Sequence, residues 1–343
     1  MTTDLIAAYL EHLAHQPTAR GRTASPATVR AQRADLAGFA AWWLQAHALA
    51  AFDLGLVQER DLRDWQTHRQ VEDGAAVATI NRACASLRAF FGWAHAGGHL
   101  RHNPAAQLRD LPAEDQAPPH LAPEAVPWLF RATNTIDDPM RRARDRTILT
   151  LLANCGLRSQ EAVDVQLRDL DLAGGTLTVR AGKGGKVRRL PLDSESLRQL
   201  REYVQQRCLG GLPVAGSGQE REQLLVAFHR TGGAGRWEPG MSTAAVRKGL
   251  DELGEAAATL VEEQARKTSS LARTGELEGL ARQLRAVSPH QLRHWLGYQL
   301  RARGVDLGVV QRLLGHSRPA TTLRYGQPTE ADLREALRRA NGG

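Results

Sequence analysis

The chain has 343 residues, of which 42% are hydrophobic and 24% charged, so it suits two globular domains and excludes a wholly disordered or fibrous protein. No apolar run approaches the roughly 18 residues that span a bilayer, and the N-terminus lacks the basic start of a signal peptide, so we expect a cytoplasmic protein without membrane contact. The 45 Lys and Arg against 37 Asp and Glu give a net charge of +8, which favours a polyanionic partner. The three cysteines match no metal or disulfide spacing and are expected to be buried; they are Cys84, Cys155 and Cys208.

The first predicted elements are helices. Apolar side chains recur at spacings of three and four residues over 5–13, 29–43, 62–65 and 80–94. Such a spacing places the apolar residues of each segment on one face of a helix. We therefore predict a small all-helical domain over residues 1–112.

A linker between two domains is predicted at residues 113–120. The prolines at 112, 118 and 119, with acidic and polar residues between them, favour extended and exposed chain. Residues up to 112 hold 11 Lys and Arg against 10 Asp and Glu, and the remainder holds 34 against 27. The second domain, residues 121–343, therefore carries the basic excess.

The second domain is predicted to combine helices with short strands. Two of the strands flank a glycine-rich turn that contains Lys183 and Lys186, two of only four lysines in the chain. The fold class expected for the whole chain is mainly α with a small β-sheet. The predicted order is a helix within 123–152, strands at 175–180 and 187–192, a helix at 194–208, a strand at 224–228 and helices from 242 onward.

Four short motifs of the second domain hold residue types suited to phosphodiester chemistry. Each residue alone has an ordinary explanation, such as a surface salt bridge, a helix cap or a half-buried aromatic side chain. Together, guanidinium groups can bind phosphate oxygens, an ammonium can protonate a leaving oxygen, an imidazole can exchange a proton and a tyrosine hydroxyl can attack phosphorus, without a metal ion. The motifs are Gly156-Leu157-Arg158 with Glu161, the turn with Lys183, His290 with Arg293, and Gly315-His316 with Tyr325.

In order, spacing and residue type these motifs resemble those of the tyrosine recombinases, the phage integrase and Xer-type family. The resemblance covers about 121–326 and, more weakly, the helical segment before it, which is similar to the family's SAM-like core-binding domain. It implies a two-domain clamp around DNA, with a helical core-binding domain and a mixed α/β catalytic domain. The implied roles are Tyr325 as nucleophile, Arg158 and Arg293 as phosphate-binding groups, Lys183 as general acid, His290 as general base or orienting group, His316 as hydrogen-bond donor to the phosphate and Glu161 as support for Arg158.

The activity implied is site-specific recombination, in which DNA strands are cut and rejoined through a covalent 3′-phosphotyrosyl intermediate during integration, excision or resolution via a Holliday junction. The implied partner is double-stranded DNA with a specific core site in the nucleoid, and no cofactor or metal is expected. Two alternatives stay open: strand relaxation of the type IB topoisomerase kind, and a non-catalytic DNA-binding accessory factor on the same scaffold. Base recognition depends on side-chain geometry, so the target site and the choice among chromosome dimer resolution, phage integration and transposon resolution cannot be read from the residues.

Further DNA contacts are predicted at lower specificity. A helix start exposes amides that favour phosphate, and polar residues on a later helix of the first domain could lie along a DNA backbone. Because that domain is nearly neutral, solvated helix faces explain these residues equally well. The candidates are Thr28, Arg30, Asn81, Arg82 and Arg88 in the first domain, and Arg188 and Lys186 in the hairpin, where Lys186 is also the rival of Lys183 for the acid role.

Two segments of the second domain are expected to serve assembly. Residues 256–286 are interpreted as a helical insertion, because Lys183 and His290 lie farther apart than in compact members of the family. Either this segment contacts a neighbouring protomer or an accessory protein, or it packs as a lid on its own domain. Residues 329–341 are predicted to form a helix that docks into the next subunit, since the resemblance implies a homo-tetramer on two DNA duplexes.

Overall fold

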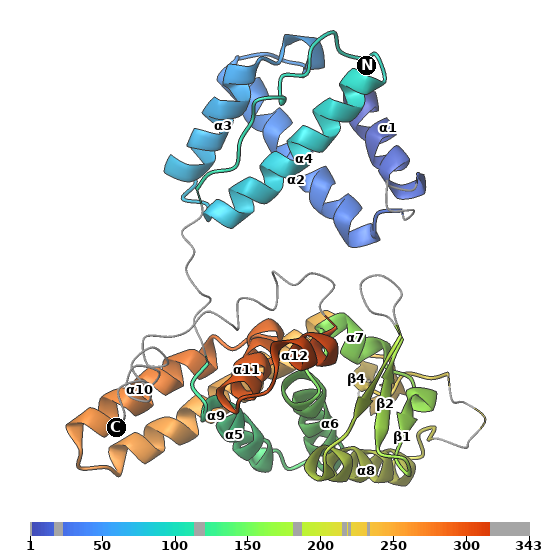
Figure 1. Cartoon of the computed structure of the whole chain (residues 1–343), viewed down its shortest axis with the longest axis vertical. Coiled ribbons are helices and arrows are strands. Elements are labelled where there is room, and N and C mark those ends of the chain that lie inside the picture. The colour runs from blue at the N-terminus through green and yellow to red at the C-terminus, as the bar shows by residue number, and fades with distance from the viewer. Residues whose placement is uncertain are drawn as a thin grey trace. The chain divides into compact units, whose positions relative to one another are not determined.

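The chain forms two compact units, Met1–Gln116 and Ala117–Gly343, and each is described by itself (Figure 1). Four predicted site residues, Lys183, Lys186, His316 and Tyr325, lie outside the described residues, as do the predicted linker and the predicted C-terminal helix. The computed structural model describes residues 2–16, 23–112, 121–180, 187–214, 218, 221–231 and 234–315.

The first unit is helical in its described part, as the apolar spacing predicts. Phe39 of α2 is fully buried, and its ring lies edge-on to those of Trp65 in α3 and Phe91 in α4, with centroids 5.7 and 6.1 Å apart. Such aromatic pairs add to the apolar area that holds the helices together. The elements are α1 (Thr2–His15), α2 (Pro26–Ala46), η1 (Leu54–Leu56), α3 (Glu59–Val71) and α4 (Val77–Ala96).

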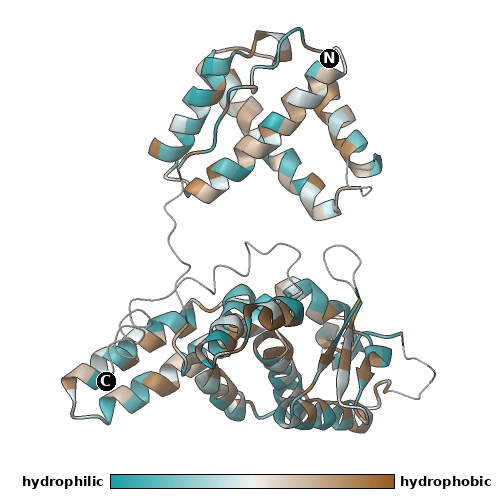
Figure 2. Ribbon diagram, viewed as in Figure 1, coloured by the Kyte–Doolittle hydropathy of each residue, from teal (hydrophilic) through white to brown (hydrophobic). Residues whose placement is uncertain are grey.

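In the second unit helices lie beside an antiparallel sheet of order β1-β2-β3 and a two-stranded sheet, β4-β5 (Figure 2). The strands predicted on either side of the glycine-rich turn are confirmed as β2 and β3, and the strand predicted at 224–228 overlaps β4. The short β1 and β5 were not predicted. Leu177 on β2 pairs with Leu190 on β3, and both face the core. The elements are α5 (Ala125–Ala132), η2 (Thr133–Thr135), α6 (Pro139–Leu149), η3 (Thr150–Asn154), α7 (Ser159–Asp164), η4 (Leu167–Asp169), β1 (Leu170–Asp171), β2 (Thr176–Val179), β3 (Arg188–Pro191), α8 (Ser194–Leu209), β4 (Val226–Thr231), β5 (Ala234–Pro239), α9 (Thr243–Arg266), α10 (Leu271–Arg285), α11 (Pro289–Ala302) and α12 (Leu307–Leu314).

Helix α6 continues into a π-helical turn, η3, directly before the first sequence motif. A hydrogen bond from the Leu157 amide to the Leu151 carbonyl, 2.9 Å long, closes this turn. Gly156, within the turn, has a φ of +63°. A positive φ of this kind ends many helices and favours glycine, because a side chain there meets the following carbonyl. The chain thereby leaves η3 sharply and enters α7 at Arg158.

Gly156→Ala is expected to destabilise the protein by about 2–4 kcal/mol, from backbone strain and from crowding. A Cβ at this position would lie 2.6 Å from Leu314 Cδ2 and 2.9 Å from Leu296 Cδ2, so these two buried or partly buried side chains would have to shift. Urea denaturation measures the loss. Gly175→Ala is the matched control, since Gly175 has φ +61° but no atom within 4 Å of its Cβ position. Equal losses in the two variants would contradict the crowding argument.

Helices α9 and α10 form an antiparallel helical hairpin (Figure 1). Leu277 and Leu284 of α10 are buried, and Arg285 donates across the hairpin to Glu262 at 2.6 Å. The predicted insertion, residues 256–286, falls on the second half of α9 and on α10. Helix α9 also packs on α5, which is the arrangement that the lid interpretation requires, and contact with another protomer stays a prediction.

The cysteines are not all buried as expected. Cys84 and Cys155 are buried, and burial raises the pKa of the Cys155 thiol to about 12, so this thiol stays protonated beside the first motif. Cys208 is exposed, and that expectation is wrong. The reason is rotation along α8: Arg207 lies on the buried face, and the next residue is turned by about 100° toward solvent.

Candidate functional site

Arg158 lies at the N-cap position of α7, where the turn at Gly156 places it. Its backbone amide donates to Glu161 Oε2 at 3.0 Å, and its Nη1 donates to Glu161 Oε1 at 2.7 Å. The carboxylate three residues into the helix therefore holds both the helix start and the guanidinium. About a third of the Arg158 side chain is exposed, so the group is oriented yet accessible.

Glu161 is the buried centre of an arginine cluster. Arg188 of β3 donates Nη1 to Oε1 at 3.1 Å and Nη2 to Oε2 at 2.8 Å, and Arg293 Nη1 lies 3.7 Å from Oε2. Burial alone would raise the pKa of Glu161, but the hydrogen bonds from Arg188 and from the Arg158 amide outweigh it and bring the pKa to about 2. One carboxylate thus faces three guanidinium groups, which leaves two positive charges in excess.

Arg293 projects from α11 into this cluster and is only 2% exposed. Its Nη1 donates to the Gly156 carbonyl at 2.5 Å, and its Nη2 donates to the carbonyl of Leu314 at the end of α12. A buried guanidinium with charge-assisted bonds of this kind is held in one orientation. The structure therefore brings together Arg158, Glu161 and Arg293, three of the predicted site residues.

His290 lies in the first turn of α11, the helix that carries Arg293. Ser288 caps this helix by accepting from the Gln291 amide at 3.3 Å. The His290 ring meets that of His294 edge-on, with centroids 4.6 Å apart. His290 itself is exposed, so its imidazole lies on the accessible side of the site.

The segments that carry the remaining predicted residues begin next to this cluster. Val179 pairs with Arg188 at the end of the β2–β3 ladder, and Lys183 lies between these two residues in the sequence. Gly315 caps α12 at φ +63°, and a Cβ there would lie 3.1 Å from Arg188 Nη1. His316 is the next residue in the chain.

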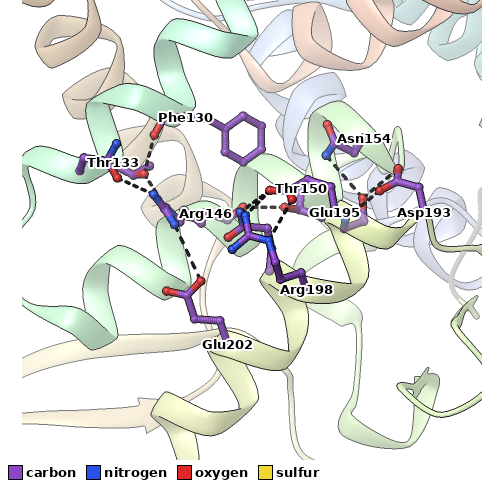
Figure 3. A network of polar contacts seen from close by, with 12 residues as sticks. Phe130, Thr133, Arg146, Thr150, Asn154, Asp193, Glu195, Arg198 and Glu202 are labelled. Carbon is purple, nitrogen blue, oxygen red and sulfur yellow. Dashed lines mark hydrogen bonds and ion pairs between the residues drawn. The ribbon is translucent and has the colours of Figure 1, made fainter.

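A polar network fixes the position of the helix that leads into the site (Figure 3). Arg146 of α6 donates to Thr133 Oγ1 at 2.9 Å and lies 3.8 Å from Glu202 of α8. Further along, Asn154 of η3 donates to Ser196 Oγ at 3.4 Å. Figure 3 shows Arg146 and Asn154 within this network of polar contacts, which holds the helical segment before Gly156 in place.

Three of the residues predicted to contact DNA from the first unit have protein partners. Asn81 donates to the Leu111 carbonyl at 2.9 Å and accepts from its amide at 2.8 Å, Arg82 lies 2.5 Å from Asp35, and Arg88 donates to the Leu108 carbonyl at 3.0 Å. Asn81 and Arg88 thereby tie α4 to the segment before the predicted linker. The prediction of DNA contact by these residues stays open. Thr28 and Arg30, also predicted contacts, are exposed near the start of α2.

Sequence reasoning missed the place of Arg188 and the π-helical turn. The sequence-based prediction counted Arg188 among the DNA contacts, whereas the Arg188 side chain points inward, like the side chain of Leu190 two residues later. The alternation of the strand carried that signal. Within the described residues, no three His, Cys, Asp or Glu side chains gather so as to hold a metal ion, and no helix there is long and apolar enough to cross a membrane.

Comparison with known proteins matches both units. Residues 120–331 match the model of the phage integrase family, and residues 6–98 match that of the phage integrase N-terminal SAM-like domain. Tyrosine recombinase XerC of Rhodospirillum centenum is 33% identical over 321 residues, covering 92% of this chain and 81% of the relative. Tyrosine recombinase XerD of Pseudomonas aeruginosa is 30% identical over 315 residues, covering 90% and 89%.

The fold is also that of a solved transposon integrase. The Tn1549 transposon integrase in complex with a circular intermediate DNA superposes with a TM-score of 0.64 at 21% identity, covering 98% of each chain. The fold class predicted from the sequence is confirmed, and the relatives, which are named as recombinases, do not favour the topoisomerase or accessory-factor alternatives. Since one family model covers more than half of the chain and the relatives span nearly all of it, the chain belongs to the phage integrase family, the tyrosine recombinases.

Proposed function

We propose that this tyrosine recombinase cuts and rejoins double-stranded DNA at a specific core site through a covalent bond between Tyr325 and a 3′ phosphate. The observation that carries the proposal is the arginine cluster, in which Arg158, Arg188 and Arg293 face the single buried carboxylate of Glu161, so two positive charges are in excess. Such a cluster matches the charge of a phosphate in a pentacoordinate transition state, and its donors are oriented before the substrate binds.

The proposed reaction conserves the energy of the phosphodiester. The Tyr325 hydroxyl attacks phosphorus, the bond to the 5′ oxygen breaks, and Lys183 gives that oxygen a proton. His290 accepts the tyrosine proton or orients the phosphate, and His316 donates a hydrogen bond to it. In the reverse direction a 5′ hydroxyl of another strand attacks the phosphotyrosine, so strand exchange requires no high-energy cofactor.

We further propose the assembly that the family resemblance implies. Four copies act on two duplexes, each unit of a copy contacts the DNA, and residues 329–341 of one copy dock on the next. An accessory protein is a further proposed partner. Because the substrate is chromosomal or mobile DNA, the proposed place of action is the cytoplasm, at the nucleoid.

A nicked duplex tests the proposed function. Duplexes that the full chain binds are selected from a randomised pool, and a nick is placed beside the scissile phosphate so that the short product diffuses away. The wild-type protein is expected to accumulate a covalent adduct that denaturing gels resolve, and Tyr325→Phe is expected to give none, because phenylalanine has no nucleophilic oxygen. An adduct formed by Tyr325→Phe would overturn the assignment of the nucleophile.

A further inference from the structure

Arg188 has the contacts of a residue inside the site and not of a DNA-contacting surface residue. Its side chain is 14% exposed, and both of its terminal nitrogens donate to the two carboxylate oxygens of Glu161. The neighbouring Arg189 is exposed and bonds to Thr176 Oγ1 at 3.1 Å. Successive strand residues point to opposite faces, so β3 presents one arginine to the cluster and the next to solvent.

Three parts of the site meet at Arg188. Through Glu161 its guanidinium reaches α7 and the guanidinium of Arg158. Its backbone pairs with Val179 at the end of the β2–β3 ladder, and residues 181–186 follow β2 in the sequence. At Gly315 a Cβ would lie 3.1 Å from its Nη1 and 3.3 Å from its Cζ, so the guanidinium lies against the last turn of α12.

We propose that Arg188 is a positioning residue for strand cleavage: it fixes Arg158 through the shared carboxylate of Glu161 and holds the sheet end and the α12 end from which the segments with Lys183 and His316 continue. This inference rests on the proposed function and replaces the sequence-based prediction that Arg188 contacts DNA. Arginine suits the role because its planar fork reaches both carboxylate oxygens at once, which the point charge of a lysine does not.

The main test separates cleavage from DNA binding. Arg188→Gln in the full chain is expected to slow single-turnover cleavage of the selected nicked duplex about 100-fold, the effect of a small misplacement of reacting groups, while affinity for that duplex and its salt dependence stay unchanged. Arg189→Gln, one residue away on the exposed face, is the matched control and is expected to cleave at the wild-type rate. A loss of affinity together with a decrease of about one in the slope of log affinity against log salt would mark Arg188 as a phosphate contact and overturn the proposal.

The pH dependence of the cleavage rate distinguishes a changed Glu161 pKa from a general loss of structure. The charged groups that face Glu161 are Arg158 from α7, Arg188 from β3 and Arg293 from α11. Without the Arg188 hydrogen bonds, burial raises the pKa of Glu161 from about 2, so the acid limb of the cleavage profile should shift to higher pH in Arg188→Gln. An unshifted acid limb would contradict the proposed coupling.

A double variant and a conservative variant test the contact between Arg188 and Glu161 further. Glu161→Gln combined with Arg188→Gln should cleave no more slowly than the slower single variant, because both act through one contact; multiplied losses would overturn the proposal. Should Arg188→Gln fail to fold, Arg188→Lys retains the charge and is expected to bind DNA normally and cleave about tenfold more slowly. A wild-type chain that forms no adduct overturns the proposed function and this inference with it, whereas a wild-type adduct with unimpaired Arg188 variants overturns this inference alone.

Discussion

Replacing Arg293 by alanine is expected to slow strand cleavage by about 10³-fold and to lower the free energy of unfolding by about 3–5 kcal/mol. The rate falls because, in the proposed reaction, Arg293 is a preorganised donor to the scissile phosphate. Stability falls because the Gly156 and Leu314 carbonyls lose a buried donor and Glu161 loses a neighbouring positive charge. Single-turnover cleavage and urea denaturation measure the two effects separately.

Two further variants define the Arg293 experiment. Arg303→Ala, at the exposed C-cap of the same helix, is the matched control and is expected to change the free energy of unfolding by less than about 0.5 kcal/mol. Arg293→Lys retains a charge but cannot reach both carbonyls, so we expect most of the cleavage defect to persist. Wild-type cleavage by Arg293→Ala would remove this residue from the proposed phosphate site.

Glu161→Gln is expected to lower the free energy of unfolding by about 3 kcal/mol at neutral pH and to slow cleavage by at least 100-fold. The pKa of this carboxyl falls from 4.5 to about 2 on folding, because the bonds to Arg188 and Arg158 outweigh the effect of burial. A depressed pKa means that the stabilisation is complete above about pH 5 and is lost as the pH falls toward 2. The amide variant lacks this titration and leaves three guanidinium groups without a counter-ion.

The pH dependence of stability gives the sharpest check on Glu161. Between about pH 5 and pH 2 the wild-type free energy of unfolding should fall more steeply than that of Glu161→Gln, so the two curves approach each other in acid. Glu195→Gln serves as control, because Glu195 also bonds to an arginine, Arg198, but is exposed. Exposed pairs contribute little, and we expect a change below about 1 kcal/mol. Parallel curves for wild type and Glu161→Gln would contradict the role of the carboxylate.

The local part of the site was predictable from the sequence. The serine and proline before His290 are helix-start signals, and α11 begins there. The spacing of three between Arg158 and Glu161 suits a carboxylate that orients the arginine, and the structure has that contact. The glycine-rich turn between two β-rich segments likewise predicted β2 and β3. These features depend on residues close together in the chain, which is why spacing and turn chemistry suffice.

The parts that sequence reasoning missed depend on contacts between distant segments. Arg293 is buried because α12 approaches the turn at Gly156. Arg188 points inward because its partner, Glu161, lies on α7. Asn81 and Arg88 are polar residues on a helix face, which suits a DNA contact or a bond to the chain after α4 equally well. For Asn81 and Arg88 no spacing rule distinguishes these outcomes, because the partner lies 20 or more residues away.

The bonds made by Arg293 also have a consequence for the order in which the site matures. The guanidinium and the Gly156 carbonyl are 137 residues apart in sequence, and the Leu314 carbonyl comes 21 residues later still. Contacts of such separation close late in folding, since the intervening chain must first be ordered. A nascent chain that ends at α10 therefore contains Arg158 and Glu161 but not Arg293, which lies on α11. The arginine cluster is therefore incomplete until α11 and α12 have been synthesised and packed.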